Sequence, residues 1–127
     1  MIEKVFTDRA PTPIGPYSQD VASNGFVFCA GQIGLDPKSG RLVDGDISAQ
    51  TRQALENLFA VLDAANAEGL VFVNIYTIDI SQFGAINEVY EDFLKSKGIE
   101  PFPARAVVEV SSLPAGASVE IAAVAVE

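Results

Sequence analysis

Histidine and tryptophan are absent from the 127-residue sequence, and cysteine occurs once, as Cys29. Without histidine the chain cannot form the Ser-His or Cys-His pairs that many covalent hydrolases use. A single cysteine excludes an internal disulfide and a cysteine-rich zinc site, and it agrees with a reducing, cytoplasmic environment. We interpret Cys29 as a buried apolar group, because no basic neighbour in the sequence lowers its pKa. Carboxylates, arginine, hydroxyls, backbone groups and water remain, so we expect no metal and no cofactor.

Positive charge and long apolar runs are scarce as well. The chain has 8 basic and 17 acidic residues, a net charge of −9 that repels phosphate backbones and predicts no nucleic-acid partner. No apolar run approaches the ~20 residues of a membrane span, and the first residues lack a signal-peptide core, so we expect no membrane association. Glycine-rich phosphate loops are missing too. Schiff-base chemistry is not indicated, because every lysine is in a polar or terminal context: Lys4, Lys38, Lys95 and Lys97.

The apolar pattern predicts a single domain over residues 1–127 that contains both strands and helices. Apolar periodicity predicts a helix from the cap Asp46 to about residue 66, and a second helix over 82–96, capped by Ser81 and ended by Gly98. The predicted strands are a short one ending at residue 23, followed by 26–30, 70–80, 105–112 and 118–126.

This order of elements predicts an α+β two-layer sandwich with a mixed sheet and two helices on one face. The second helix lies between two predicted strands, so we expect those strands to be parallel. The strands over 70–80, 105–112 and 118–126 carry apolar or small residues on both faces. Two helices can cover only one face, and we therefore predict a homo-oligomer that buries the other.

Two charged residues lie inside these apolar strands, Arg105 and Glu120. A charge among residues that favour burial must be paired, or must await a ligand of opposite charge. Arg105 offers a planar fork that matches a carboxylate, and Glu120 offers a proton acceptor or donor. The alternatives are structural: Arg105 could extend its head into water, and Glu120 could protect an edge strand.

The spacing of Arg105 and Glu120 makes direct contact within one hairpin improbable. If the last two strands formed a hairpin, the residues would be separated by ~16 Å, at ~3.3 Å per residue. A shared site would then need non-neighbouring strands or two subunits, and we favour a subunit interface.

Three further segments are candidates for the same site. The proline-rich loop over 10–18 carries Tyr17 and is either a rigid site loop or an ordinary surface connector. Gly31 and Gly34 follow an apolar strand and allow the backbone to approach another group closely. Asn87 is by default a helix-surface residue.

Five short motifs occur in the order and spacing of the Rid (YjgF-like) family, which includes the 2-iminobutanoate/2-iminopropanoate deaminases. They are Ile-Gly-Pro-Tyr-Ser over 14–18, Ala-Gly-Gln-Ile over 30–33, Phe83 with Asn-Glu-Val-Tyr over 87–90, Pro-Ala-Arg over 103–105 and Val-Glu-Ile over 119–121. The chain resembles this family over essentially its whole length. The resemblance implies a chorismate-mutase-like fold and a homotrimer, with sheets facing inward, helices outside and three clefts between subunits.

The resemblance also implies an activity and site residues. Relatives hydrolyse reactive enamine and imine acids (2-aminoacrylate, 2-iminobutanoate and 2-iminopropanoate) to 2-keto acids and ammonia, in functional coupling to pyridoxal-phosphate dehydratases. By position, Arg105 would clamp the substrate carboxylate, the Gly31 N–H would support that clamp, and Glu120 would position water. Tyr17 and Asn87 would border the cleft.

The chain departs from the deaminase pattern at Ala30, where active relatives commonly carry Ser or Thr, and at Val107, where many carry Cys. Ala30 leaves open an alternative function, a non-catalytic trimer that binds small carboxylates or regulates a partner. RNA-directed action, attached to some relatives, is disfavoured by the charge and the lack of histidine. Chorismate mutase activity would rest on fold analogy alone, because it needs several cationic contacts.

Overall fold

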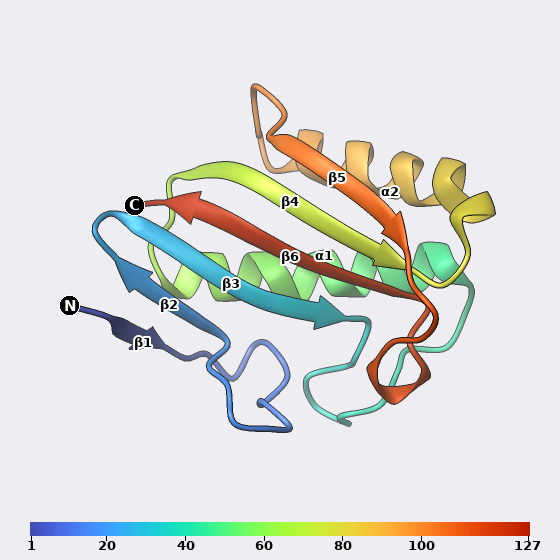
Figure 1. The fold of residues 1–127 in the computed structure, drawn as a ribbon, viewed down its shortest axis with the longest axis horizontal. Coiled ribbons are helices and arrows are strands. Elements are labelled where there is room, and N and C mark those ends of the chain that lie inside the picture. Colours follow the sequence, from blue (N-terminus) through green and yellow to red (C-terminus); the bar gives the residue numbers. More distant parts are fainter.

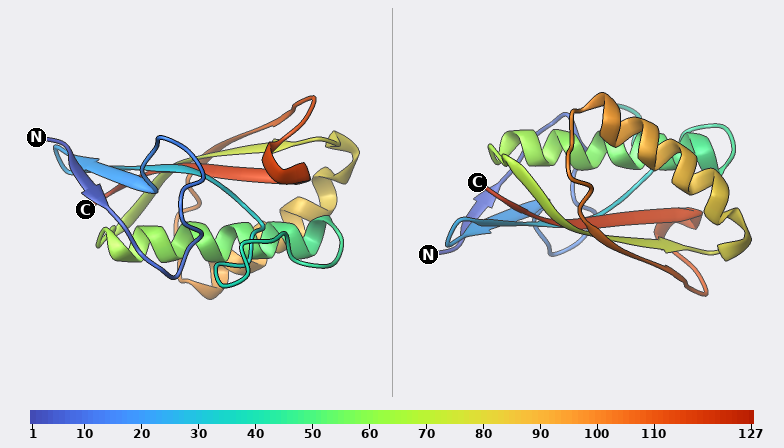
Figure 2. Two further views of the ribbon diagram at one scale, coloured as in Figure 1. Left: turned by 90° about the horizontal axis from the view of Figure 1, so that it is seen from below. Right: turned by 90° about the horizontal axis from the view of Figure 1, so that it is seen from above.

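The computed structural model describes residues 1–127 as one six-stranded sheet with two helices (Figure 1). The helices are α1 (Ile47–Ala64) and α2 (Phe83–Ser96), and short 3₁₀ turns form η1 (Ile80–Gln82) and η2 (Pro114–Gly116). The strands are β1 (Glu3–Val5), β2 (Asp20–Ser23), β3 (Phe26–Ile33), β4 (Gly69–Thr77), β5 (Ala104–Glu109) and β6 (Val119–Val126). Both helices lie on one side of the sheet, as Figure 2 shows. The predicted α+β class with a mixed sheet and two helices is confirmed.

The strand order is β1-β2-β3-β6-β4-β5, so the C-terminal strand β6 lies in the middle of the sheet. β4 and β5 are parallel, as predicted for strands joined through a helix, and the other neighbours are antiparallel. Because β4 separates β5 from β6, the last two strands do not form a hairpin.

The helix boundaries follow from local capping. The Asp46 side chain accepts a hydrogen bond from the backbone N–H of Ala49 at 3.1 Å and starts α1, as predicted. The prediction that Ser81 caps the second helix is wrong. Asp79 accepts hydrogen bonds from both the N–H and the hydroxyl of Ser81, so a 3₁₀ turn precedes α2 and the strand ends early, at Thr77. Gly98 follows α2 at φ +71°, as the helix C-terminus requires.

The core lies between the helices and one face of the sheet. Val73 and Ile75 of β4 and Ile121 of β6 are fully buried there, and α1 contributes Leu55 and Leu58. Neither helix has the length and apolar character to cross a membrane.

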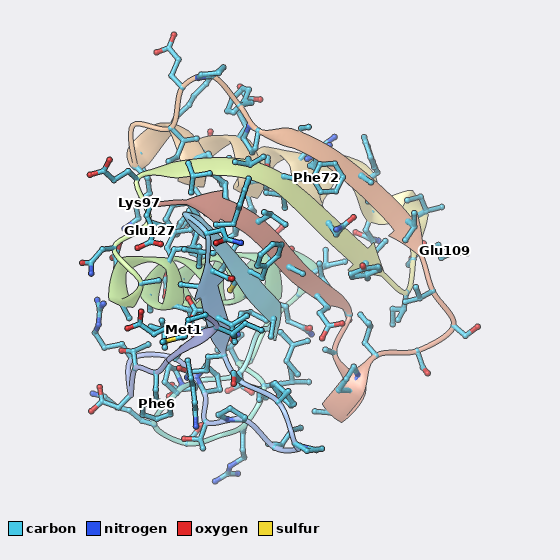
Figure 3. All side chains as sticks on the ribbon, turned by 60° about the vertical axis from the view of Figure 1, so that its left-hand side comes forward. Met1, Phe6, Phe72, Lys97, Glu109 and Glu127 are labelled. Carbon is cyan, nitrogen blue, oxygen red and sulfur yellow. The ribbon has the colours of Figure 1, made fainter.

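The other face of the sheet, called here the open face, carries no helix (Figure 2). The strand register aligns an apolar row across it: Phe28 of β3 is opposite Val124 of β6, which is opposite Phe72 of β4. Phe72 is labelled in Figure 3. Phe28 is 47% exposed. The face that the sequence predicts to be buried in an oligomer is therefore uncovered in a single chain.

One buried acidic side chain has no partner within the chain. Asp20 of β2 pairs with Cys29 of β3, is 1% exposed, and neither of its carboxylate oxygens has a hydrogen-bond partner. Burial raises the pKa of Asp20 from 3.8 to about 6. Because the native-state pKa lies above the unfolded one, the contribution of Asp20 to stability is greatest below pH 3.8 and is lost as pH rises through about 6.

The variant Asp20→Asn should therefore be more stable than the parent at pH 8 and equally stable at pH 4. Thermal unfolding should show a rise in Tm of roughly 3–6 °C at pH 8, which shrinks toward zero at pH 4. Asp44→Asn, at an exposed position, controls for the loss of one surface charge. Equal Tm differences at both pH values would contradict the assignment.

Candidate functional site

Arg105 projects from β5 toward α2 and has no acidic partner. It is opposite Val73 in the parallel pair, so it shares the helix-covered face of the sheet. Its guanidinium carbon lies 4.8 Å from the ring centroid of Tyr90 and 5.7 Å from that of Phe83. The one ion pair in the chain joins Lys95 and Glu91. The charge of Arg105 is therefore not neutralised within the chain.

Glu120 lies on β6, in the centre of the sheet, and projects from the open face. It is opposite Ile33 of β3 and Tyr76 of β4. Its place in a central strand removes the interpretation that it protects a sheet edge. Partial burial raises the pKa of Glu120 above its ordinary value. A carboxyl with a raised pKa is a stronger proton acceptor than an ordinary glutamate.

Gly31 lies directly against the Glu120 carboxyl. The β3–β6 pairing shifts register between Cys29 and Gln32, so two residues of β3, Ala30 and Gly31, oppose one of β6. A Cβ at position 31 would lie 2.7 Å from Glu120 Cδ and 2.8 Å from Oε2. The close approach predicted for this glycine is therefore an approach to Glu120.

The loop that carries Tyr17 is held by a buried amide, Gln19. The Gln19 side chain accepts a hydrogen bond from Thr7 N–H at 2.8 Å, and donates to the carbonyls of Thr7 at 2.9 Å and Pro11 at 3.0 Å. Its backbone carbonyl accepts a hydrogen bond from Ala30 N–H at 2.9 Å. These bonds fix the loop beside the bulge, so the segment is a built part of the site and not a loose connector.

The predicted residues fall into two separate openings of one chain. The first, of about 320 Å³, brings Tyr17, Ala30, Gly31 and Glu120 together. The second, of about 270 Å³, brings together Arg105 and Asn87, whose buried Oδ1 has no hydrogen-bond partner.

These two openings lie on opposite faces of the sheet. Arg105 aligns with Val73 and Glu120 aligns with Tyr76, and side chains three residues apart on one strand face opposite sides. Within one chain the guanidinium and the carboxyl cannot contact the same small ligand.

Sequence reasoning missed three residues at these openings. Gln19 gave no signal, because side-chain bonds to a loop 8 to 12 residues away leave no periodic pattern. Phe83 and Tyr90 belong to one motif of the family resemblance, but the sequence assigns neither of them a role at a site. Their spacing with Asn87 does place all three on one stripe of α2, and that stripe faces Arg105.

Other candidate chemistry is absent from both openings. No three His, Cys, Asp or Glu side chains gather in a way that could hold a metal ion. Cys29 is buried, and burial raises the pKa of its thiol far above the usual value. Its interpretation as an apolar core group agrees with this placement.

Comparisons with known proteins agree with the architecture. Residues 7–127 match the family model described as Endoribonuclease L-PSP, which represents the YjgF/Rid family. The chain is 47% identical to a RutC family protein of Pyrococcus horikoshii, with 98% of each chain covered. It is 41% identical to the human 2-iminobutanoate/2-iminopropanoate deaminase, with 97% of this chain and 88% of the relative covered. The crystal structure of Escherichia coli TdcF with bound serine superposes with a TM-score of 0.94 at 35% identity, with 98% of each chain covered.

The contact between Gly31 and Glu120 predicts the effect of a single methyl group. Gly31→Ala should displace the Glu120 carboxyl while the fold remains, because the atoms that clash belong to the flexible end of a side chain. A crystal structure of the variant should show the carboxyl moved by about 1 Å or more, with Tm changed by less than roughly 5 °C. Gly84→Ala is the control, because a methyl group there meets open space. An unmoved Glu120 carboxyl in Gly31→Ala would contradict the contact.

Proposed function

The chain belongs to the Rid (YjgF-like) family, and from this premise we propose that it hydrolyses enamine and imine acids to 2-keto acids and ammonia. The substrates would be 2-aminoacrylate, 2-iminobutanoate and 2-iminopropanoate. The observation that carries the proposal is the Arg105 guanidinium, which is partly buried at an opening without any acidic partner. A small carboxylate supplies the missing charge in the planar geometry that arginine matches.

The proposed reaction uses Glu120 as the proton carrier. Water attacks the C=N carbon of the protonated imine, a C–O bond forms, and Glu120 accepts the proton that the water loses. Glu120 then returns this proton to nitrogen. As the C–N bond breaks, the hydroxyl oxygen forms the C=O bond and gives up its proton through Glu120 to the departing ammonia, so ammonium and a 2-keto acid leave. The raised pKa of Glu120 makes it a stronger acceptor for the proton of the attacking water. An already electrophilic iminium carbon requires no covalent nucleophile.

Two subunits would complete each site. Arg105 and Glu120 lie on opposite faces of one sheet, and Arg105 is on β5, an edge strand. The apolar open face needs a cover, and packing three open faces together would place the β5 edge of one subunit beside the first opening of the next. We infer a homotrimer in which Arg105 and Asn87 of one subunit face Tyr17, Gly31 and Glu120 of its neighbour.

A non-catalytic carboxylate-binding trimer is the alternative that an observation favours. Ala30 lies in the first opening beside Gly31 and offers no hydroxyl to hold water or substrate. The Arg105 site would bind a keto acid equally well in such a protein. RNA cleavage, which the description of the family model names, finds no support in a chain with no histidine and a net charge of −9.

Semicarbazide trapping tests the deaminase proposal. A serine or threonine dehydratase releases imine, semicarbazide traps it, and the wild-type chain should suppress trapping in proportion to its concentration. Arg105→Ala should lower kcat/KM by about 10²-fold through lost positioning. Glu120→Gln should lower kcat by ~10²–10⁴-fold through lost proton transfer.

Circular dichroism and size measurements on both variants control for loss of fold or assembly. If wild-type protein leaves trapping unchanged at high concentration while binding pyruvate through Arg105, the non-catalytic alternative replaces the deaminase.

The oligomer has its own test on the open face. Phe28→Asp should produce monomers with no deaminase activity, because a charge in the apolar row cannot be buried against a neighbour. Analytical ultracentrifugation should give the mass of three chains for wild type and of one for the variant. Arg52→Glu, which adds negative charge to the exposed side of α1, should leave the trimer intact. A monomeric, active wild-type protein would refute the inferred assembly.

A further inference from the structure

The guanidinium of Arg105 lies between two aromatic rings of the same helix. Phe83 and Tyr90 are seven residues apart on α2, about 10 Å along the helix axis, and both belong to the stripe that faces β5. The Arg105 guanidinium carbon lies 5.7 Å from one ring centroid and 4.8 Å from the other. Both distances are within the range in which a cation is attracted to an aromatic ring.

The contact with the two rings can orient Arg105 without an ion pair. A carboxylate clamp must be held in one orientation before the ligand arrives, but a salt bridge within the chain would neutralise its charge and occupy its N–H groups. Aromatic rings attract the cation through their π electrons and leave the N–H donors in the plane of the guanidinium unused. No acidic side chain in the chain pairs with Arg105.

We propose that Phe83 and Tyr90 are positioning residues that orient the Arg105 guanidinium for in-plane binding of a carboxylate, a role that rests on the function proposed above. The two rings contact the cation from α2, at the opening that Arg105 lines together with Asn87 and Tyr90. The role proposed for both rings acts through the guanidinium.

The part of Tyr90 that orients the guanidinium is its ring and not its hydroxyl. The Tyr90 side chain is 6% exposed and its hydroxyl has no hydrogen-bond partner in the chain. Burial raises the pKa of Tyr90 to about 12, so the phenol stays neutral. Tyr90→Phe should therefore keep both aromatic rings beside the Arg105 guanidinium, and Tyr90→Leu should remove one of the two.

The matched control is Phe93→Leu. Phe93 is buried in the same helix and packs edge-on against Phe59 at 5.2 Å, away from Arg105. The Phe93→Leu variant therefore removes a buried ring from the same helix without removing a contact to the Arg105 guanidinium. Phe83→Leu is the second test variant, because Phe83 is 40% exposed and its removal does not open the core.

Pyruvate serves as the carboxylate probe, with its Kd measured by calorimetry, and the Nε–Hε resonance of Arg105 reports on the guanidinium itself. That resonance is identified by its disappearance in Arg105→Lys. Tyr90→Leu and Phe83→Leu should each raise the pyruvate Kd by roughly three- to tenfold and shift or broaden the Arg105 resonance. In the deaminase assay KM should rise by a similar factor and kcat should change less. Tyr90→Phe and Phe93→Leu should stay within about twofold of wild type in all three readouts.

The outcomes separate this proposal from the deaminase. If the wild-type chain does not deaminate but Tyr90→Leu and Phe83→Leu still weaken pyruvate binding, the positioning role of the two rings stands and the deaminase proposal fails. If the wild type also binds no pyruvate, the change in the Arg105 resonance alone tests whether the rings orient the guanidinium. If Tyr90→Leu does not fold, Phe83→Leu provides that test. The positioning role would be overturned if neither ring variant changed the Arg105 resonance or the pyruvate Kd.

Discussion

The alternation of side chains across the sheet determines how this protein can act. Arg105 aligns with Val73 and Glu120 with Tyr76, so the cation and the acid of the proposed reaction project from opposite faces. Neither opening of a single chain holds both groups. The proposed reaction therefore needs a second copy to supply one of the two groups, and the open face, with its apolar row through Phe28, Val124 and Phe72, is the surface available for it.

Both charged groups are held at a cost to the chain that carries them. Glu120 is partly desolvated beside Gly31, and Arg105 has two rings beside it in place of a carboxylate. A charged side chain that is partly buried without a partner of opposite charge lowers the stability of the folded chain. In the proposed two-subunit site, a substrate carboxylate would pair with Arg105 and the protonated imine nitrogen would pair with Glu120, which is the reason the geometry favours a substrate site over a structural ion pair.

Much of the fold could be predicted from local sequence, and the rest depends on long-range pairing. Periodicity predicted both helices, Asp46 as a cap and the parallel pair β4–β5, because these follow from neighbouring residues. The Ser81 prediction was wrong because Asp79, two residues earlier, caps an extra 3₁₀ turn. The insertion of β6 between β3 and β4 could not be read from the sequence, because no local pattern specifies which strands pair.

Some residues of the candidate site could be predicted from the sequence and others could not. Arg105 and Glu120 could be found because each is a charge in an apolar strand. Gly31 could be flagged as a close approach, but its partner Glu120 required the β3–β6 bulge. Phe83 and Tyr90 have the apolar spacing of any core helix, so the sequence pattern does not indicate their contact with Arg105.

Subunit mixing tests the two-subunit site most directly. Arg105→Ala and Glu120→Gln trimers are dissociated together and reassembled, and deaminase activity is compared with that of each variant reassembled alone. If each site takes its arginine from one subunit and its glutamate from the next, an equal mixture should recover about a quarter of wild-type activity, because one interface in four is then intact. Activity no higher than that of the separate variants would contradict a site built by two subunits.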